Sequence, residues 1–240
     1  MLQGKVVVVT GAAKGIGRYA AKGFAEAGAR LGIVDIDAPR LQRVAEEAKQ
    51  LGAEVLSEYG DVSNEDDVRR IMDHVVSQFG CIDVLVNDAA VVTHFGWEPR
   101  WARIAEMDKG FWDRVIQTNL GGTFLCTKHA LRHMEARRAG HIINLHGGGN
   151  GVGACAYVVS KDAIRTFTRF VAEEERDKGI CVVAITPGGA IATEDAPESM
   201  PREMAGLDSL GNRFLLAAEV GMEMTGQLLT LRDGKLVVRQ

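Results

Sequence analysis

Short apolar runs alternate along the chain with longer segments in which apolar residues recur every three or four positions. The runs are rich in β-branched residues and predict seven strands: Val6 to Val9, Leu31 to Val34, Glu54 to Glu58, Val84 to Val86, His141 to Leu145, Cys181 to Ile185 and Gln227 to Leu231. The longer segments predict helices over Gly15 to Ala27, Ala38 to Leu51, Glu65 to Phe79, Phe111 to Arg138 and Ala156 to Lys178. This alternation indicates a doubly wound α/β fold of the Rossmann type, with a parallel seven-stranded sheet and helices on both faces.

Two segments depart from this pattern. The connections at about 91–110 and 188–212 are long and rich in Glu, Pro, Met and aromatic residues, and long loops in compact α/β proteins are usually functional. We expect them to form the walls of a substrate pocket. The side chains of His94, Phe95, Trp97 and Trp101 form an aromatic wall or anchor the first loop to the body. No linker or repeat interrupts the pattern, which predicts a single domain over residues 1–240.

Composition narrows the class of partner. The chain has 46% hydrophobic and 25% charged residues and a net charge of -4, the balance of a globular protein. Charged residues are scattered, so nothing indicates a nucleic-acid or membrane-surface partner, and a small molecule is expected. The four cysteines are far apart and predict buried thiols, with no metal site. An early run of only four valines is too short for a signal peptide or membrane span, which predicts a cytoplasmic protein.

A glycine-rich turn follows the first predicted strand and leads directly into a helix. It reads Thr10-Gly11-Ala12-Ala13-Lys14-Gly15-Ile16-Gly17. Glycines allow the backbone to turn tightly and to approach a pyrophosphate, and a helix N-terminus offers unpaired N–H groups and a partial positive charge. A plain tight turn is the alternative, but a strand before it and a helix after it are the context of a dinucleotide-binding site.

An acidic residue closes the second predicted strand, where the adenosine ribose of a dinucleotide would lie. Asp35 stands at the expected distance, and its carboxylate would repel a 2′-phosphate. The sequence therefore favours NAD over NADP, although Lys14 beside the turn could attract such a phosphate. Asp37 is expected to be a solvated loop residue or a helix cap.

With these residues in place, the chain resembles the short-chain dehydrogenase/reductase family, in its shorter single-domain branch, over nearly its whole length. The family's TGxxxGxG turn is matched by Thr10, Gly11, Gly15 and Gly17, and its acidic-apolar pair by Asp61 and Val62. Its NNAG segment appears in part as Asn87-Asp88-Ala89-Ala90, its helix asparagine as Asn119, its YxxxK motif as Tyr157 and Lys161, and its PG pair as Pro187 and Gly188.

The resemblance implies a tyrosine that exchanges a proton while hydride passes to or from a nicotinamide. Tyr157 would be the acid/base, Lys161 one helical turn away would favour the phenolate and hold the ribose, and Asn119 would support a proton path. Taken singly, each is an ordinary structural residue, and only their conjunction indicates function. The implied cofactor contacts are Gly11, Lys14, Gly15, Ile16, Gly17, Asp35, Asp61, Val62, Asn87, Ala89, Tyr157, Lys161, Pro187, Gly188 and Thr193.

The serine that relatives carry after the fifth strand is missing. The stretch from His141 to Val159 holds no serine or threonine, and the expected position falls on His146 or Gly147. Three hypotheses follow. His146 donates the lost hydrogen bond; Asn150 or backbone N–H groups of the glycine run orient the substrate at reduced rate; or the chain binds NAD(H) with little or no turnover.

The segment after the PG pair also departs from the family, with an extra residue before Thr193, and predicts a more open pocket. The sequence thus predicts an NAD(H)-dependent oxidoreductase that interconverts a small secondary alcohol and a ketone. Its rival is a noncatalytic or weakly active NAD(H)-binding protein. The resemblance further implies a homodimer or homotetramer.

Overall fold

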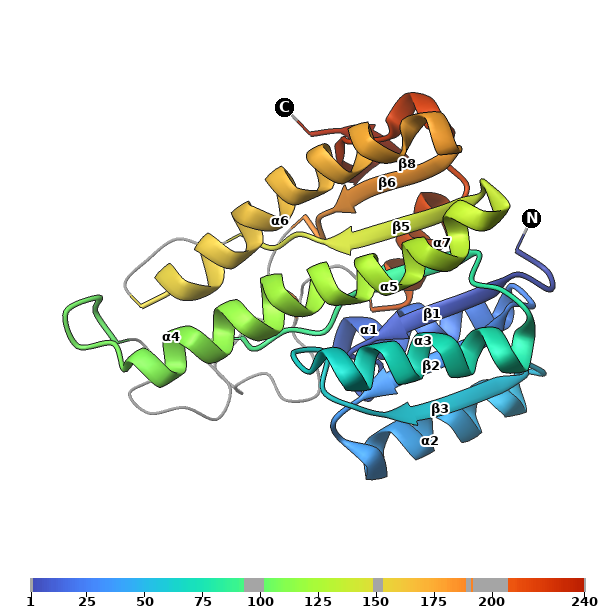
Figure 1. The fold of residues 1–240 in the computed structure, drawn as a ribbon, viewed down its shortest axis with the longest axis horizontal. Coiled ribbons are helices and arrows are strands. Elements are labelled where there is room, and N and C mark those ends of the chain that lie inside the picture. The colour runs from blue at the N-terminus through green and yellow to red at the C-terminus, as the bar shows by residue number, and fades with distance from the viewer. Residues whose placement is uncertain (1, 93–101, 149–152, 189–190, 192–206, 240) are drawn as a thin grey trace.

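One eight-stranded sheet forms the centre of the molecule (Figure 1). The computed structural model describes residues 2–92, 102–148, 153–188, 191 and 207–239. The strand order is β3-β2-β1-β4-β5-β6-β7-β8, in which the first seven strands are parallel and the last is antiparallel. The strands are β1 (Val6–Thr10), β2 (Arg30–Asp35), β3 (Val55–Tyr59), β4 (Val84–Asn87), β5 (Gly140–Leu145), β6 (Ile180–Ile185), β7 (Leu228–Arg232) and β8 (Lys235–Val238).

Helices cover both faces of this sheet. One face carries α1 (Gly15–Glu26), α2 (Ala38–Gln50) and α7 (Leu207–Ala217), and the other carries α3 (Glu65–Phe79), α5 (Gly122–Arg137) and α6 (Cys155–Glu175). Short 3-10 turns lie at Arg176–Lys178 (η2) and Met222–Met224 (η3). The doubly wound fold that the sequence predicts is confirmed, and its seven strands and five helices lie within a few residues of the expected bounds.

The sheet has one strand more than predicted. β8 pairs with β7 through a two-residue hairpin turn, Asp233-Gly234, in which both residues have positive φ, 51° and 74°. Asp-Gly is the pair that a type I′ hairpin turn favours, because both central residues must adopt left-handed backbone angles. The expectation of seven strands was therefore wrong by one, although this turn could have been recognised in the sequence.

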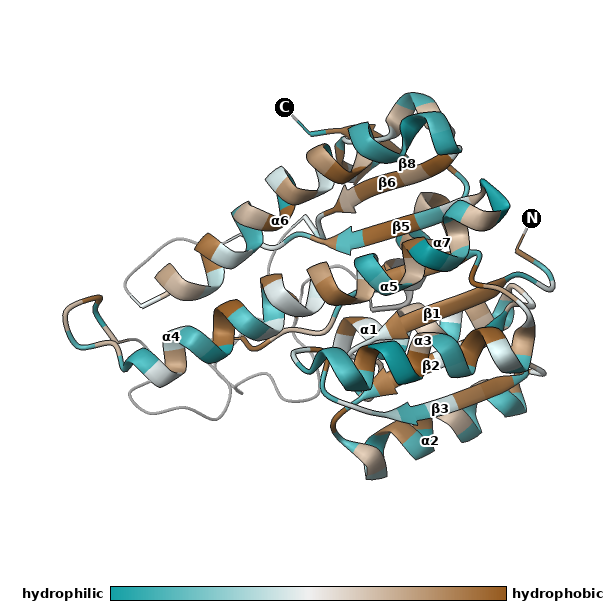
Figure 2. Cartoon of the chain, viewed as in Figure 1, coloured by the Kyte–Doolittle hydropathy of each residue, from teal (hydrophilic) through white to brown (hydrophobic). Residues whose placement is uncertain are grey.

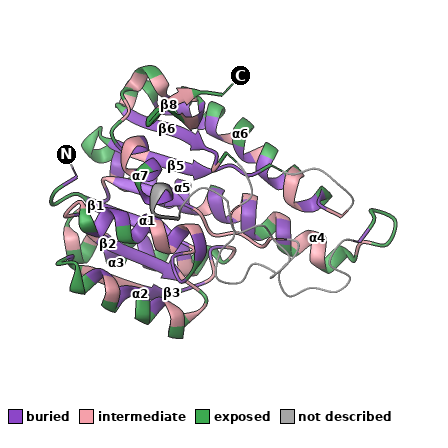
Figure 3. Ribbon diagram, turned by 180° about the vertical axis from the view of Figure 1, so that it is seen from behind, coloured by how far each residue is buried: buried purple, intermediate pink, exposed green. Residues whose placement is uncertain are grey.

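The two faces of the sheet hold separate cores. Side chains alternate across each strand, so Val7 and Val9 of β1 pack under α1, α2 and α7, whereas Val6 and Val8 pack under α3, α5 and α6. Strands buried on both faces explain the continuous apolar runs in the sequence (Figures 2 and 3).

None of the described helices is long and apolar enough to cross a membrane.

The predicted helix from Phe111 to Arg138 is divided. It comprises α4 (Lys109–Ile116), a π-helical turn η1 (Gln117–Gly121) and α5. A π turn inserts one extra residue per turn and often marks a functional site. Here it contains Asn119, whose side chain is fully buried beside α6.

The second predicted loop, 188–212, is shorter than expected at its C-terminal end, because α7 begins at Leu207 and packs against α1. Gly211 of α7 lies against Gly23 of α1, where a Cβ on Gly23 would be 3.1 Å from the Gly211 Cα. The two glycines thus allow a close helix contact that a helical-spacing search does not detect. Residues 93–101 of the first predicted loop and residues 189–190 and 192–206 of the second lie outside the described residues, and they include His94, Phe95, Trp97, Trp101 and Thr193.

Candidate active site

The glycine turn after β1, residues Gly11 to Gly17, lies tightly against the end of β4. Gly11 has φ +69°, and a Cβ on it would be 2.7 Å from the Cα of Ala89. A Cβ on Gly17 would be 2.2 Å from the Gly11 carbonyl oxygen. No side chain fits at either position, so the sequence requires glycine here for close approach of backbone to backbone, as a dinucleotide-binding turn demands.

Thr10, the last residue of β1, joins the turn to β4. Its hydroxyl donates to the carbonyl of Val86 at 3.2 Å and accepts the backbone N–H groups of Asp88 and Ala89 at 3.1 and 3.3 Å. Thr10 is 2% exposed, so these bonds are shielded from water. The two segments that would face the cofactor are therefore held as one unit.

Asp35 lies at the edge of this turn. Its Oδ2 accepts the backbone N–H of Ala13 at 3.0 Å and its Oδ1 accepts that of Asp37 at the same distance. The carboxylate therefore braces the turn from the end of β2, where a ribose is expected. The side chain of Asp37 caps α2 by accepting the backbone N–H of Arg40 at 3.1 Å. The helix-cap role expected from the sequence is therefore the one that the structure has.

The remaining residues predicted for the adenosine end lie beside the turn. Lys14 is exposed at the start of α1, and Ile16 is half-buried against the core. Asp61 follows β3 and accepts the hydroxyl of Ser63 at 2.7 Å. Val62 is buried and packs so closely on Gly122 that a Cβ there would be 2.6 Å from a Val62 methyl carbon.

A chain of buried amides links the strand ends to the catalytic helix. The Asn87 Nδ2 donates to Asn144 Oδ1 at 2.8 Å and to Thr127 at 3.1 Å, and Asn144 Nδ2 donates to Thr168 of α6 at 2.9 Å. These buried bonds fix β4, β5 and α6 relative to one another, although Asn87 Oδ1 itself has no hydrogen-bond partner among the described residues. Asn87 thus lies behind the site and supports it.

Tyr157 and Lys161 lie one turn apart in α6 and face the end of β5. Lys161 is 1% exposed, and its Nζ donates to the carbonyl of Leu145 at 3.0 Å. The same Nζ lies 5.8 Å from the centroid of the Tyr157 ring. Burial lowers the pKa of Lys161 to about 8, and attraction to Asp88 opposes that shift.

The Tyr157 phenol has a raised pKa. Burial is the main cause and the Asp88 carboxylate adds to it, which raises the pKa to about 12. The sequence led us to expect that Lys161 would favour the phenolate. In the protein alone, desolvation of the phenolate sets the direction of the shift, opposite to that expectation.

Asn119 holds the first turn of α6 and the start of the first long loop. Its side chain pairs with the backbone of Val91 in both directions, accepting the N–H at 2.7 Å and donating to the carbonyl at 3.2 Å. It also donates to Ser160 Oγ at 3.0 Å, and Ser160 donates to the carbonyl of Tyr157 at 2.6 Å. The π turn thus places Asn119 where it positions the catalytic helix.

Gly147 occupies the place beside the Tyr157 hydroxyl. A Cβ on Gly147 would be 2.3 Å from the Tyr157 Oη and 3.0 Å from Cζ. A serine side chain cannot enter there unless the tyrosine moves. Of the two positions to which the sequence assigned the missing serine, the one next to the acid/base is therefore Gly147.

His146 is directed elsewhere. Its Nε2 lies 3.4 Å from the Asp162 carboxylate on α6, and its buried Nδ1 has no hydrogen-bond partner among the described residues. Burial lowers the pKa of His146, although Asp162 opposes the shift. A neutral ring that donates Nε2–H to Asp162 leaves Nδ1 as an acceptor, which cannot replace a donating hydroxyl. Asn150, the other candidate side chain, lies outside the described residues.

Arg213 of α7 supports the turn after β6. Its guanidinium donates to the carbonyls of Thr186, at 3.3 Å, and Pro187. A Cβ on Gly188, which has φ +83°, would be 3.5 Å from an Arg213 nitrogen. The predicted Pro187-Gly188 pair is thus held at the sheet edge near the site by an arginine that no motif indicated.

Asp88 is a half-buried carboxylate inside the glycine turn. It accepts the backbone N–H of Gly17, and a Cβ on Gly17 would be 2.8 Å from its Oδ2. Burial raises its pKa to about 7, repulsion from Asp35 adds to this, and attraction to Lys161 and the Gly17 N–H oppose it. The sequence indicated Asp88 only as a mismatch in NNAG, whereas the structure places it within reach of both the Gly17 N–H of the glycine turn and the charge of Lys161.

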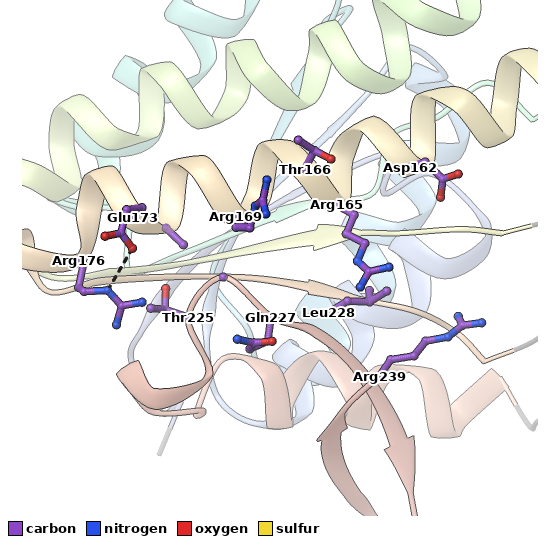
Figure 4. Close-up of a pocket in the computed structure, with 12 residues that line it drawn as sticks. Asp162, Arg165, Thr166, Arg169, Glu173, Arg176, Thr225, Gln227, Leu228 and Arg239 are labelled. Carbon is purple, nitrogen blue, oxygen red and sulfur yellow. Dashed lines mark ion pairs between the residues drawn. The ribbon is translucent and has the colours of Figure 1, made fainter.

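A cavity of about 590 Å³ lies along α6 (Figure 4). Asp162, the partner of His146, lies at one end, and Arg176, paired with Glu173, lies at the other. Arg165, Arg169 and Arg239 also line it. This groove adjoins the back of the candidate site through the His146–Asp162 pair.

Comparison with known proteins agrees with this geometry. The model of the short chain dehydrogenase family matches residues 5–203. The chain belongs to the short-chain dehydrogenase family. A curated relative, the cis-4-hydroxycyclohexanecarboxylate dehydrogenase of Sinomonas cyclohexanicum, is 39% identical over 78% of this chain and 73% of its own.

Two solved structures share the fold over nearly their full length. A metagenomic short-chain oxidoreductase in complex with NADP has a TM-score of 0.81 and 29% identity, covering 96% of this chain and 97% of the other. An NAD⁺-bound xylitol dehydrogenase has a TM-score of 0.83 and 25% identity, covering 96% and 98%. Short-chain dehydrogenases similar to this chain therefore bind NAD or NADP, and the curated relative is named for oxidation of a hydroxyl-bearing substrate.

The residues present fit a dinucleotide. The glycine turn leaves no room for a Cβ at Gly11 or Gly17, and the first turn of α1 contains no acidic residue. Asp35 and Asp61 lie beside it at the ends of neighbouring strands. The sequence did not indicate two residues that the structure places at the candidate site, Asp88 and Arg213. The mismatch in the NNAG motif was a signal for Asp88, whereas no motif pointed to Arg213.

Proposed function

We propose that this short-chain dehydrogenase interconverts a secondary alcohol and a ketone with NAD(H), using Tyr157 as the acid/base and Lys161 as the cation that tunes it. The observation that carries the proposal is the placement of the Tyr157 hydroxyl at the end of β5, with the fully buried Lys161 ammonium 5.8 Å from its ring. A buried cation near a phenol stabilises the phenolate that accepts the alcohol proton.

When bound, the nicotinamide would supply the hydride chemistry. The backbone of the glycine turn would approach the pyrophosphate, Asp35 would accept from a ribose hydroxyl, and the Pro187-Gly188 turn held by Arg213 would lie near the nicotinamide. Lys161 Nζ keeps its bond to the Leu145 carbonyl at 3.0 Å, which fixes where its charge lies. In oxidation Tyr157 Oη takes the alcohol proton; in reduction it returns that proton to the carbonyl oxygen.

Substrate orientation without the serine is proposed to come from backbone N–H groups of Gly147 and Gly148. Gly147 lies against the Tyr157 hydroxyl, and nothing lies within 4 Å of a Cβ built on Gly148, so a substrate oxygen has access there. Backbone N–H groups stabilise a developing oxyanion well where they converge on it. The contacts of His146 weigh against it as the donor and favour a role in positioning the end of β5.

The preference for NAD is proposed from Asp35. Its carboxylate already accepts two backbone N–H groups at 3.0 Å and is therefore fixed at the edge of the turn. A fixed negative charge there opposes the 2′-phosphate of NADP. Location in the cytoplasm, a single domain over residues 1–240 and a homodimer or homotetramer stay predictions from the sequence and the family.

One observation favours the second candidate function, a weakly active or noncatalytic NAD(H)-binding protein. The Tyr157 Oη occupies the space that a Cβ at position 147 would need, so the orienting hydroxyl of relatives has no place beside it. The two functions differ in turnover and not in cofactor binding. They are therefore separated by measuring both in the same preparation.

The test measures NADH binding by fluorescence and then turnover over a panel of secondary alcohols and ketones that includes cyclic hydroxy acids. Tyr157→Phe is the matched control, because it removes one oxygen and keeps the ring. We expect NADH binding by both proteins and turnover by the wild type alone. Binding with no turnover above the Tyr157→Phe level for any compound would establish the noncatalytic alternative.

A further inference from the structure

The Asp88 carboxylate takes one of the N–H groups that the sequence assigns to the cofactor. A dinucleotide turn works because the first N–H groups of α1 are free to face the pyrophosphate. Here the N–H of Gly17 is donated to Asp88, whose Oδ2 lies 2.8 Å from where a Gly17 Cβ would be. A carboxylate therefore lies at the helix N-terminus where an anion is expected to bind.

Hydrogen bonds of its own backbone and of the preceding residue hold Asp88 in this place. Its own N–H donates to the Thr10 hydroxyl at 3.1 Å, in the same bridge that joins β1 to β4. The preceding residue, Asn87, is tied to Asn144 at 2.8 Å. The carboxyl group thus has little freedom to move away when an anion approaches.

We propose, resting on the proposed NAD(H) function, that Asp88 controls cofactor affinity through its charge, so that the protein binds NAD(H) more tightly when Asp88 is protonated. Ionised Asp88 would place a negative charge beside the negative pyrophosphate at the same helix N-terminus. Protonated Asp88 removes that repulsion.

Among the described residues, three charged or titratable groups interact with Asp88. Asp35 at the end of β2 repels it, whereas Lys161 of α6 attracts it, and Asp88 in turn raises the pKa values of Tyr157 and Lys161. The Asp88 pKa of about 7 places its ionisation within the physiological range. Affinity for NADH is therefore expected to fall as the pH rises through 7.

Lys161 titrates in the neighbouring range, with a pKa of about 8, and its loss of charge would weaken NADH binding in the same direction. Asp88→Asn separates the two groups. Asparagine keeps an oxygen to accept the Gly17 N–H and removes the charge, and without Asp88 the Lys161 pKa falls. The ratio of wild-type to variant affinity is therefore compared at pH 6 and at pH 9, below and above the Lys161 pKa of about 8, because between these values the lowered Lys161 pKa of the variant also changes the ratio.

The experiment measures the Kd for NADH of wild type and Asp88→Asn by fluorescence from pH 6 to 9. NADH is the probe because a 2′-phosphate titrates near pH 6 and would confuse an NADPH series. We expect similar Kd values at pH 6 and a variant that binds about tenfold more tightly at pH 9, the effect of one like charge at a partly buried site.

Asp83→Asn is the control. Asp83 lies before β4, at the opposite end of that strand, and its Oδ2 likewise accepts a backbone N–H, that of Val6 at 2.9 Å. This variant removes the same charge away from the turn and should keep the wild-type pH series; thermal melting shows that both variants are folded.

A variant-to-wild-type ratio that stays constant from pH 6 to 9 overturns the role of Asp88 and leaves the dehydrogenase proposal intact. Failure of the wild type to bind NADH at any pH overturns the proposed function itself, and this inference with it.

Discussion

The glycine turn after β1 and the catalytic cluster after β5 are built in different ways. In the turn, Gly17 is required by its contact with the Gly11 carbonyl within the same short segment, and Gly11 by its contact with the backbone of Ala89 after β4. The catalytic cluster joins Leu145 and Gly147 after β5 to Tyr157 and Lys161 of α6, and it is tied through Ser160 to Asn119 of η1. A turn that only glycine can form leaves a motif in the sequence. A site built from side chains of several elements can change its chemistry through one residue and still keep its motif.

The largest effect is expected from removing the charge of the catalytic cluster. Lys161→Met keeps the length and the burial of the side chain but removes the ammonium that donates to the Leu145 carbonyl. Turnover should fall about 10³-fold, since the phenolate of Tyr157 then has no cation beside it. Steady-state rates on a substrate found in the panel measure this. Lys22→Met, on the exposed face of α1, is the control, and a loss of less than tenfold in Lys161→Met would contradict the assignment.

The next effect tests the space beside the tyrosine. Gly147→Ser restores the family's serine but places a Cβ where the Tyr157 Oη now lies, 2.3 Å away. We expect turnover to fall about 10²-fold, because a displacement of about 1 Å misplaces the proton-accepting oxygen. Gly148→Ser, where nothing lies within 4 Å of the new Cβ, is the matched control. A rise in turnover with Gly147→Ser would mean that the loop moves to admit the serine.

A smaller effect is expected at the glycine turn. Asp35→Ala removes the carboxylate that is proposed to exclude a 2′-phosphate, so the preference for NADH over NADPH should fall about tenfold. The ratio of the two Kd values measures it. Because Asp35 also accepts the N–H of Ala13, Asp35→Asn serves as the second variant, which keeps an acceptor oxygen without the charge. An unchanged ratio in both variants would place the ribose elsewhere.

The smallest effect concerns His146. Its pKa is lowered from the ordinary value of 6.5 by burial, so the unfolded chain binds more protons than the folded one below that pH. Stability is full above pH 6.5 and is lost as the pH falls toward the folded pKa. Between pH 7 and pH 5, the melting temperature of His146→Gln should therefore fall less than that of the wild type.

The same residue also allows a test of activity. His146→Ala should lower turnover only severalfold, and a 10³-fold loss would instead support His146 as the orienting donor.

Features with a regular period or a short motif were predictable from the sequence, whereas features built from several elements were not. Strand and helix positions, the glycine turn and the Asp37 cap were predictable, because each depends on residues close in sequence or on a regular period, whereas the bond of Asp35 to the Ala13 N–H was not predicted. The extra strand β8 was missed although Asp233-Gly234 indicated its turn. β8 is short and largely half-exposed or exposed, so its hydrophobic pattern is weak.

The sequence by itself determined the fold class and the family and predicted Tyr157 and Lys161 as the reacting pair, because periodicity and motif spacing are properties of one chain read in order. Only the tertiary structure decided which residue faces Tyr157. It placed Gly147 against the hydroxyl, turned His146 toward Asp162 and set Asp88 on the Gly17 N–H. Those contacts join different helices, strands and loops, where burial and neighbouring charge, and not residue type, set the chemistry.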